Sequence, residues 1–174
     1  EQRNDLLMAK ETLHEAIKEM DGEMTARFND TFISIRAQFK EAFRELFGGG
    51  QADLVLIDPN NLLETGIEIV AQPPGKKLQS LSLLSGGERA LTAIALLFAI
   101  LNTRPVPFCI LDEVEAALDE SNVIRYSQYL KKYSKETQFI VITHRKGTME
   151  GADVLYGITM QESGVSKLVS VKLT

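Results

Sequence analysis

The sequence predicts an α/β fold in which parallel strands are covered by helices, with antiparallel strands on both flanks and a long helix in front. The first observation is a helical spacing of apolar residues that continues over residues 1–47. The second is a pair of buried strand-like runs, Phe108–Leu111 and Gln138–Ile142, separated by a helical pattern at 120–133. Strands that alternate with a helix in this way favour a parallel layer.

Composition limits the classes of protein to which the chain can belong. The 174 residues are 44% hydrophobic and 25% charged, which is typical of a globular protein with one core and an appendage. A net charge of −5 argues against a basic nucleic-acid clamp, so any DNA contact needs a local patch. The single cysteine, Cys109, excludes a disulfide framework, and we expect it in the core. No signal peptide or membrane span is expected, which predicts a cytoplasmic protein with no membrane partner.

The first 47 residues form one predicted helix, with roughly 70 Å of length at 1.5 Å per residue. Its apolar residues recur at intervals of three and four after an initial step of seven: Leu6, Leu13, Ile17, Met20, Met24, Phe28, Phe32, Ile35, Phe39, Phe43 and Leu46. Such a helix could dock along its whole length on the globular part. We favour a coiled-coil arm whose early part pairs with a helix from elsewhere, while its Phe-rich end packs on the globular part.

The globular part is expected to begin at Gly48-Gly49-Gly50, which divides the chain into an arm, 1–47, and a lobe, 48–174. Outside the parallel layer, the lobe has four runs that read as paired antiparallel strands. They are Ala52–Ile57, Gly66–Ala71, Asp153–Met160 and Ser166–Leu173.

A helix start at Leu84-Ser85-Gly86-Gly87-Glu88 is a candidate anion site. Ser85 at the cap and two glycines beside it expose backbone N–H groups at the positive end of the following apolar helix. The commoner use of such residues is a plain capped helix, in which Glu88 completes a capping box with Ser85.

Carboxylates stand where the first buried strand ends. Asp112-Glu113 directly follows Phe108–Leu111, a position suited to a carboxylate that holds Mg²⁺ and to a base that activates water. Two acids that merely solvate a loop are the alternative, although the small residues leading to Asp119 favour a site. His144 follows the strand 138–142, and it reaches the same edge if the two strands are neighbours. A lone histidine there is more often structural.

The phosphate-binding loop of nucleotide hydrolases is missing from the sequence. No Gly-x-x-x-x-Gly-Lys-Ser/Thr run occurs, and Gly75-Lys76-Lys77 lacks both the first glycine and the hydroxyl. The candidate site is therefore half of a nucleotide site.

These motifs resemble the ATP-binding-cassette ATPases. Leu84–Glu88 looks like their signature motif, Phe108–Glu113 like their Walker B strand, Ala116–Asp119 like their D-loop, and Ile142–His144 like their switch histidine. A long helix before the signature, glutamate at position 88, and the runs Arg145–Met149 and Tyr156–Met160 narrow the resemblance. Together they are similar to the carboxyl-terminal half of the ATPase head of a bacterial structural-maintenance-of-chromosomes (SMC) protein.

The resemblance implies roles for individual residues. Asp112 would coordinate Mg²⁺ through water and Glu113 would be the general base, both acting on ATP held by the same head. His144 would reach the γ-phosphate. The remaining residues would act across a dimer of heads: Ser85, Gly86, Gly87 and Glu88 in the signature turn and Asp119 at the seam.

The resemblance also implies cofactors, partners and a cellular role. The cofactors would be ATP and Mg²⁺. The partners would be the amino-terminal half of the same head, a second SMC subunit as in a homodimer, a kleisin subunit and DNA. The heads would serve chromosome condensation and segregation in the nucleoid-associated cytoplasm. The alternatives are a recombination or DNA-break-repair ATPase of similar layout and a non-catalytic coiled-coil scaffold.

Overall fold

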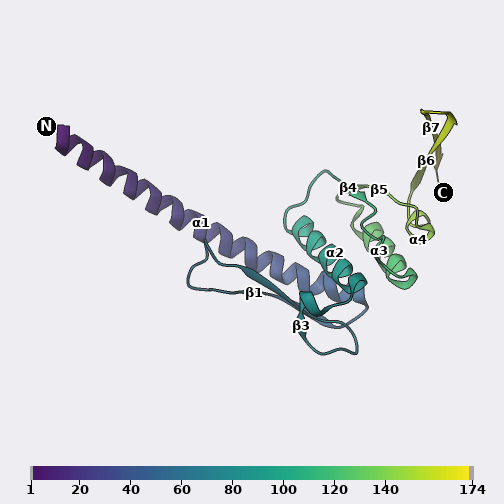
Figure 1. Ribbon diagram of the computed structural model, residues 1–174, viewed down its shortest axis with the longest axis horizontal. Coiled ribbons are helices and arrows are strands. Elements are labelled where there is room, and N and C mark those ends of the chain that lie inside the picture. Colours follow the sequence, from purple (N-terminus) through teal and green to yellow (C-terminus); the bar gives the residue numbers. More distant parts are fainter. Residues whose placement is uncertain (1, 173–174) are drawn as a thin grey trace.

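A computed structural model describes residues 2–172 of the chain. Helix α1, Gln2–Phe47, projects as a long arm from a lobe that contains all other elements (Figure 1). The Phe-rich end is buried in the lobe, with Phe39, Phe43 and Leu46 fully covered. The early part extends free of the lobe, and Leu13 and Ile17 are 64% and 54% exposed. The alternative of a helix docked along its whole length is therefore wrong, and the docking of the Phe-rich end is confirmed.

Three glycines end α1, as predicted. Gly48, Gly49 and Gly50 have φ values of 68°, 141° and 76°, a region that L side chains rarely adopt. At Gly50 a Cβ would also collide with the carbonyl oxygen of Gln72. The chain can therefore reverse here and lay the following strands against the helix that it has just left.

The first strands form an antiparallel sheet with the order β1-β2-β3. Strands β1, Gln51–Leu56, and β2, Ile67–Gln72, pair in register with Ala52 opposite Ala71, each within one residue of its expected bounds. The two-residue strand β3, Gln79–Ser80, and the 3₁₀ turn η1, Leu81–Leu83, were not expected from the sequence.

An ion-pair cluster fixes this sheet to α1. Asp53 on β1 accepts from the Arg36 guanidinium at 2.5 and 2.7 Å and lies 3.1 Å from the Lys40 ammonium. These bonds, led by that of Arg36, outweigh burial and lower the pKa of Asp53 to about 2. The arm and the sheet are thus joined by charge as well as by apolar packing.

The parallel layer is the two-stranded sheet of β4, Phe108–Asp112, and β5, Gln138–Ile142. Helices α2, Gly86–Thr103, and α3, Glu120–Tyr133, bury their apolar sides in the same core. Strand β5 and helix α3 have the bounds expected from the sequence, and the parallel pairing is confirmed. Cys109 on β4 is partly buried against the core, and this burial raises the pKa of its thiol.

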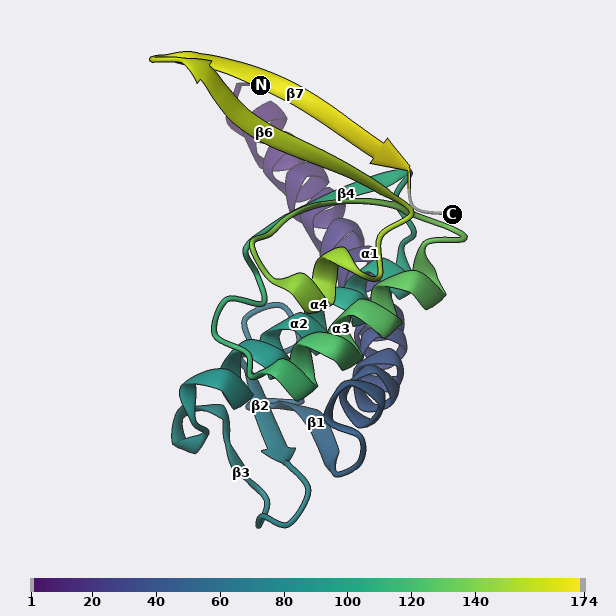
Figure 2. The same ribbon diagram turned by 90° about the vertical axis from the view of Figure 1, so that its right-hand side faces the viewer.

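The end of the described chain is the one-turn helix α4, Lys146–Met149, followed by a hairpin of β6, Val154–Glu162, and β7, Val165–Lys172. The hairpin is antiparallel, as expected, and extends away from the helices (Figure 2). Leu173, the last residue expected in β7, lies outside the described residues. Helix α4 was not expected.

Candidate nucleotide site

The signature turn caps helix α2. The Ser85 hydroxyl accepts from the Glu88 amide at 3.4 Å, and the Glu88 carboxylate accepts from the Ser85 amide at 3.0 Å. The expected capping box is therefore present. A Cβ on Gly86 would meet nothing within 4 Å, so the backbone is open to a ligand there. At Gly87 a Cβ would lie 3.0 Å from the carbonyl oxygen of Ala117, which shows how closely this turn approaches the segment before Asp119.

A lysine that the sequence analysis did not assign holds the carboxylate of this capping box. Lys76, in the loop after β2, lies 2.8 Å from Oε1 and 3.0 Å from Oε2 of Glu88. The Lys76 ammonium, followed by the Ser85 hydrogen bonds, lowers the pKa of Glu88 against the effect of burial. The Ser85 hydroxyl also donates to Glu88 at 2.8 Å. These bonds thus order the turn within the chain itself.

The ends of β4 and β5 bring together the expected metal ligand, base and histidine. Asp112 is exposed as the last residue of β4 and pairs in register with Ile142. The next residue, Glu113, donates its amide to the Ile142 carbonyl at 3.0 Å. His144 Nδ1 lies 3.3 Å from Glu113 Oε1, and both side chains are more than half exposed. The predicted shared edge is therefore confirmed as geometry.

Glu113 has an unusual backbone conformation. Its φ of 47° is the only positive value among the non-glycine residues that the structure describes. A left-handed conformation is unfavourable for glutamate, and such conformations gather at functional sites where the surroundings enforce them. Two backbone hydrogen bonds hold Glu113 in this conformation. Its amide donates to the Ile142 carbonyl, and its carbonyl accepts from the Ala116 amide at 3.0 Å.

Asp119 caps the amino-terminal end of α3. Its carboxylate accepts from the Asn122 amide and the Ser121 hydroxyl, both at 2.9 Å. These bonds lower its pKa, that of Asn122 most. Asp119 is therefore a helix cap in this structure, at the end of the segment that contacts the signature turn.

Other residues missed by the sequence analysis lie behind this edge. Glu115 is fully buried and accepts from the hydroxyls of Thr143 and Thr148. Arg145 donates to the carbonyl of Leu118 at 2.7 Å. The only sequence signal for Glu115 was that an acidic residue stands within a run of small and apolar residues. Its hydrogen-bond partners are distant in the sequence and gave no further signal.

The residues at this edge fit a magnesium ion shared with a nucleotide. Within residues 2–172, no group of three or more His, Cys, Asp or Glu side chains is placed to hold a metal by itself. Asp112 is exposed beside Glu113, and Mg²⁺ is commonly held by one or two carboxylates together with waters and substrate phosphates. The donor set therefore suits Mg²⁺ bound with ATP and not a metal enclosed by the chain alone.

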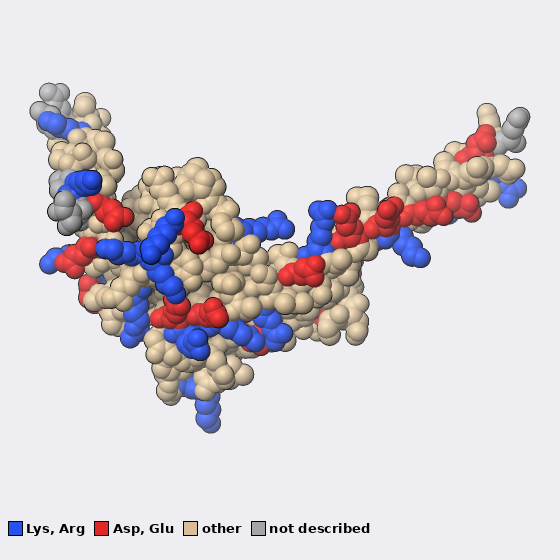
Figure 3. Space-filling view, turned by 180° about the vertical axis from the view of Figure 1, so that it is seen from behind, with Lys and Arg blue, Asp and Glu red and all other residues tan. Residues whose placement is uncertain are grey.

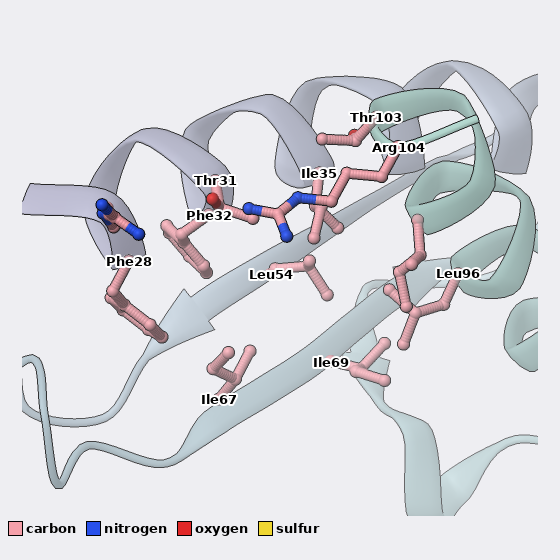
Figure 4. A pocket seen from close by; sticks show the side chains of 12 residues that line it. Phe28, Thr31, Phe32, Ile35, Leu54, Ile67, Ile69, Leu96, Thr103 and Arg104 are labelled. Atoms are coloured by element: carbon pink, nitrogen blue, oxygen red, sulfur yellow. The ribbon is translucent and has the colours of Figure 1, made fainter. Parts of the chain in front are cut away.

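A cavity in the lobe is separate from these residues. An apolar groove of about 580 Å³ lies between α1, the β1-β2 sheet and α2 (Figure 4). Phe28, Phe32, Leu54 and Ile67 are among its lining residues, and none of the candidate nucleotide residues is. Acidic side chains run along the outer arm in Figure 3, beyond this groove. Among residues 2–172, every helix is too short or too polar to span a membrane.

Comparison with known sequences agrees with the motifs. Residues 4–167 match the family model described as the RecF/RecN/SMC N terminal domain. The chain is 75% identical over 173 residues to the chromosome partition protein Smc of Bacillus subtilis (strain 168), covering 99% of this chain and 15% of that protein. It is 63% identical over 172 residues to the Smc of Desulfitobacterium hafniense (strain Y51), covering 99% of this chain and 14% of that protein. The chain thus spans only a small part of these relatives.

Solved structures give the same answer for the fold. The Smc head domain of Pyrococcus furiosus, with an extended coiled coil and bound to the C-terminal domain of ScpA, superposes with a TM-score of 0.84 at 43% identity. The match covers 98% of this chain and 43% of that one. A chain from work on ATP-driven dimerization and DNA-stimulated activation of SMC ATPases gives 0.80 at 44% identity, covering 85% and 89%. The chain therefore belongs to the RecF/RecN/SMC N-terminal domain family, and within it to the bacterial SMC proteins, of whose ATPase head it forms a part.

Proposed function

We propose that this chain is the carboxyl-terminal half of an SMC ATPase head, in which it supplies the water-activating base to one ATP and the signature turn to another. The observation that supports this most directly is the edge at which Glu113 and His144 meet beside Asp112. ATP hydrolysis needs a base, a metal carboxylate and a group near the γ-phosphate, and these three residues are of the required types.

One face of the β4-β5 sheet is apolar and exposed, which supports the proposal that another half of the head packs on it. Partners in a parallel pair point to the same side, so alternate residues of β4 and β5 form one face, which includes Phe108, Ile110 and Ile140. These three side chains are 54%, 58% and 45% exposed. Parallel sheets are covered on both faces in complete domains. We infer that the amino-terminal half, with the phosphate-binding loop, covers this face and completes the ATP site.

Within the complete head, Glu113 takes a proton from the attacking water, and His144 beside it donates to the γ-phosphate. Asp112 would hold Mg²⁺ through water. When bound, Mg²⁺ neutralises charge on the β- and γ-phosphate oxygens. Hydrolysis is thus placed at the end of β4, with this chain providing the proton acceptor.

The signature turn acts on the ATP of a second head. Gly86 and Gly87 lie at the start of α2, where backbone N–H groups and the helix dipole favour a phosphate. Ser85 then exchanges its hydrogen bond to Glu88 for one to the γ-phosphate of the opposite ATP. Asp119, near the same turn, lies at the seam between the heads. ATP binding therefore engages two heads, and hydrolysis releases them.

The cellular role follows from the relatives. The similar curated proteins are chromosome partition proteins, and a similar SMC head is bound to ScpA. We infer that the full protein organises chromosomes in the nucleoid, with a second SMC subunit, a kleisin of the ScpA type and DNA as partners. The high identity to Smc proteins favours this role over recombination or DNA repair. The outer arm, 2–24, pairs with a helix of the amino-terminal half.

The test is ATP turnover by the complete head. Glu113→Gln removes the base but keeps size and hydrogen bonding, so hydrolysis should fall by about 10²-fold or more while ATP still binds. Glu136→Gln, the same change at an exposed position after α3, is the matched control and should not alter turnover. A complete head that binds no ATP would support the scaffold alternative. Turnover that survives Glu113→Gln would refute the role of Glu113.

A further inference from the structure

The loop after β4 and the loop after β5 are held together by a buried carboxylate to which the proposed function gives no role. Glu115 lies two residues beyond Glu113, in a turn closed by its own carbonyl, which accepts from the Leu118 amide at 2.9 Å. Its side chain is fully buried, whereas Glu113 is more than half exposed. The two glutamates of this loop thus point to different environments, and only Glu113 can meet a nucleotide.

The buried carboxylate of Glu115 reaches the loop that contains the histidine. Thr143 and Thr148 both donate their hydroxyls to its Oε1, the second at 3.0 Å. The Thr143 hydroxyl in turn accepts from the Arg145 amide at 2.9 Å. The residues on both sides of His144 are therefore fixed by one chain of hydrogen bonds that ends on Glu115.

Holding a carboxylate in this place is unfavourable by itself. Glu115 Oε2 and the Tyr126 hydroxyl are buried without a hydrogen-bond partner in the described part of the chain. Burial first, and then the charge of Glu115, raises the pKa of Tyr126. An apolar side chain would avoid this desolvation, since burying an unpaired charge is costly. What an apolar side chain could not do is order the loop at Thr143.

We propose that Glu115 is a positioning residue, whose carboxylate holds the loop of His144 against the loop of Glu113. The inference rests on the proposed ATPase function. In that function His144 and Glu113, 3.3 Å apart, must face one γ-phosphate and one water. Misplacing reacting groups by about 1 Å can lower a rate by up to 10²-fold. A group that fixes both loops therefore acts on the chemical step and not on nucleotide affinity.

The test compares variants in the complete head. Glu115→Ala removes the acceptor and should lower kcat for ATP by about tenfold or more, with KM nearly unchanged. It should also speed hydrogen exchange of the Arg145 amide. Glu115→Gln keeps an oxygen for both hydroxyls and should retain most of kcat. Thr143→Val, of the same shape as threonine, should lower kcat even if Glu115→Ala fails to fold.

The matched control is Thr137→Val. Thr137 is a buried threonine beside the other end of β5, and its hydroxyl donates to the Val106 carbonyl at 2.9 Å. Its loss should leave kcat and the Arg145 amide unchanged. Parent-like kcat in Glu115→Ala or Thr143→Val would overturn the proposal, as would a Gln variant as slow as the Ala variant. Glu113→Gln, measured in parallel, reports separately on the ATPase function: if it remains active, that function fails, whatever Glu115 does.

Discussion

The predicted coiled coil can be tested quantitatively at the apolar seam of the arm, which consists of the exposed residues Leu6, Leu13, Ile17, Met20 and Met24. Leu13 and Ile17 are one helical turn apart, 64% and 54% exposed, in the part of α1 that extends beyond the lobe. Fully burying a leucine or isoleucine is worth about 1.5–3 kcal/mol. Covering the exposed fractions with a partner helix should therefore contribute about 1–2 kcal/mol for each residue. Leu13→Asp with Ile17→Asp removes both contributions and places charge in the seam.

The expected result is weaker association with the amino-terminal half, with the lobe still folded. A loss of about 3 kcal/mol or more corresponds to an increase in Kd of at least about 100-fold. Isothermal titration calorimetry between the two halves measures this change. Circular dichroism of the variant alone checks that it keeps its helix.

The control is Thr12→Asp, which adds a carboxylate beside the seam on an exposed side of the same helix. It introduces the same carboxylate into the helix but removes no apolar contact. Its Kd should stay close to that of the parent. An unchanged Kd in the Leu13 and Ile17 double variant would mean that the arm does not pair through this seam.

The remaining predictions concern the lobe. Residues 1–174 alone should neither bind nor hydrolyse ATP, because they contain no phosphate-binding loop; calorimetry and a phosphate-release assay check this, and turnover would refute the half-site proposal. Glu88→Ala removes the capping box around Ser85 and should destabilise the lobe by about 1 kcal/mol in urea unfolding. Asp53→Asn should cost about 1 kcal/mol at pH 7, after allowance for Arg36 being 42% exposed. Since the pKa of Asp53 is lowered from 3.8 to about 2, this stabilisation is complete above about pH 4 and disappears as the pH falls through 2, so parent and variant should converge there.

Periodic patterns determined how much of the fold could be predicted. The helical spacing of apolar residues indicated the bounds of α3, and a short apolar run that ends before Thr143 indicated those of β5. Strand β3 and helix α4 are two and four residues long and show no period. Their positions depend on packing against elements that are distant in the sequence.

Some residues of the candidate site could likewise be predicted from the sequence, and others could not. Glu113 and His144 could be placed at one edge because neighbouring parallel strands end together, which needs only topology. Glu115 could not be identified from the sequence, because its structural role depends on a hydrogen bond from Thr148, 33 residues away. Lys76 was considered only as a failed phosphate-binding loop, although it holds Glu88 in the signature turn. Such contacts are set by loop conformations that residue types alone do not specify.

The central claim is that the signature turn acts on the ATP of a second head, and head engagement tests it most directly. Size-exclusion chromatography with light scattering should be run with and without ATP on complete heads bearing Glu113→Gln, which should dimerise stably with ATP. Adding Ser85→Arg places a long side chain where α2 must approach the opposite γ-phosphate. The account predicts monomers that still bind ATP. Stable ATP-dependent dimers of the Ser85→Arg head would contradict it.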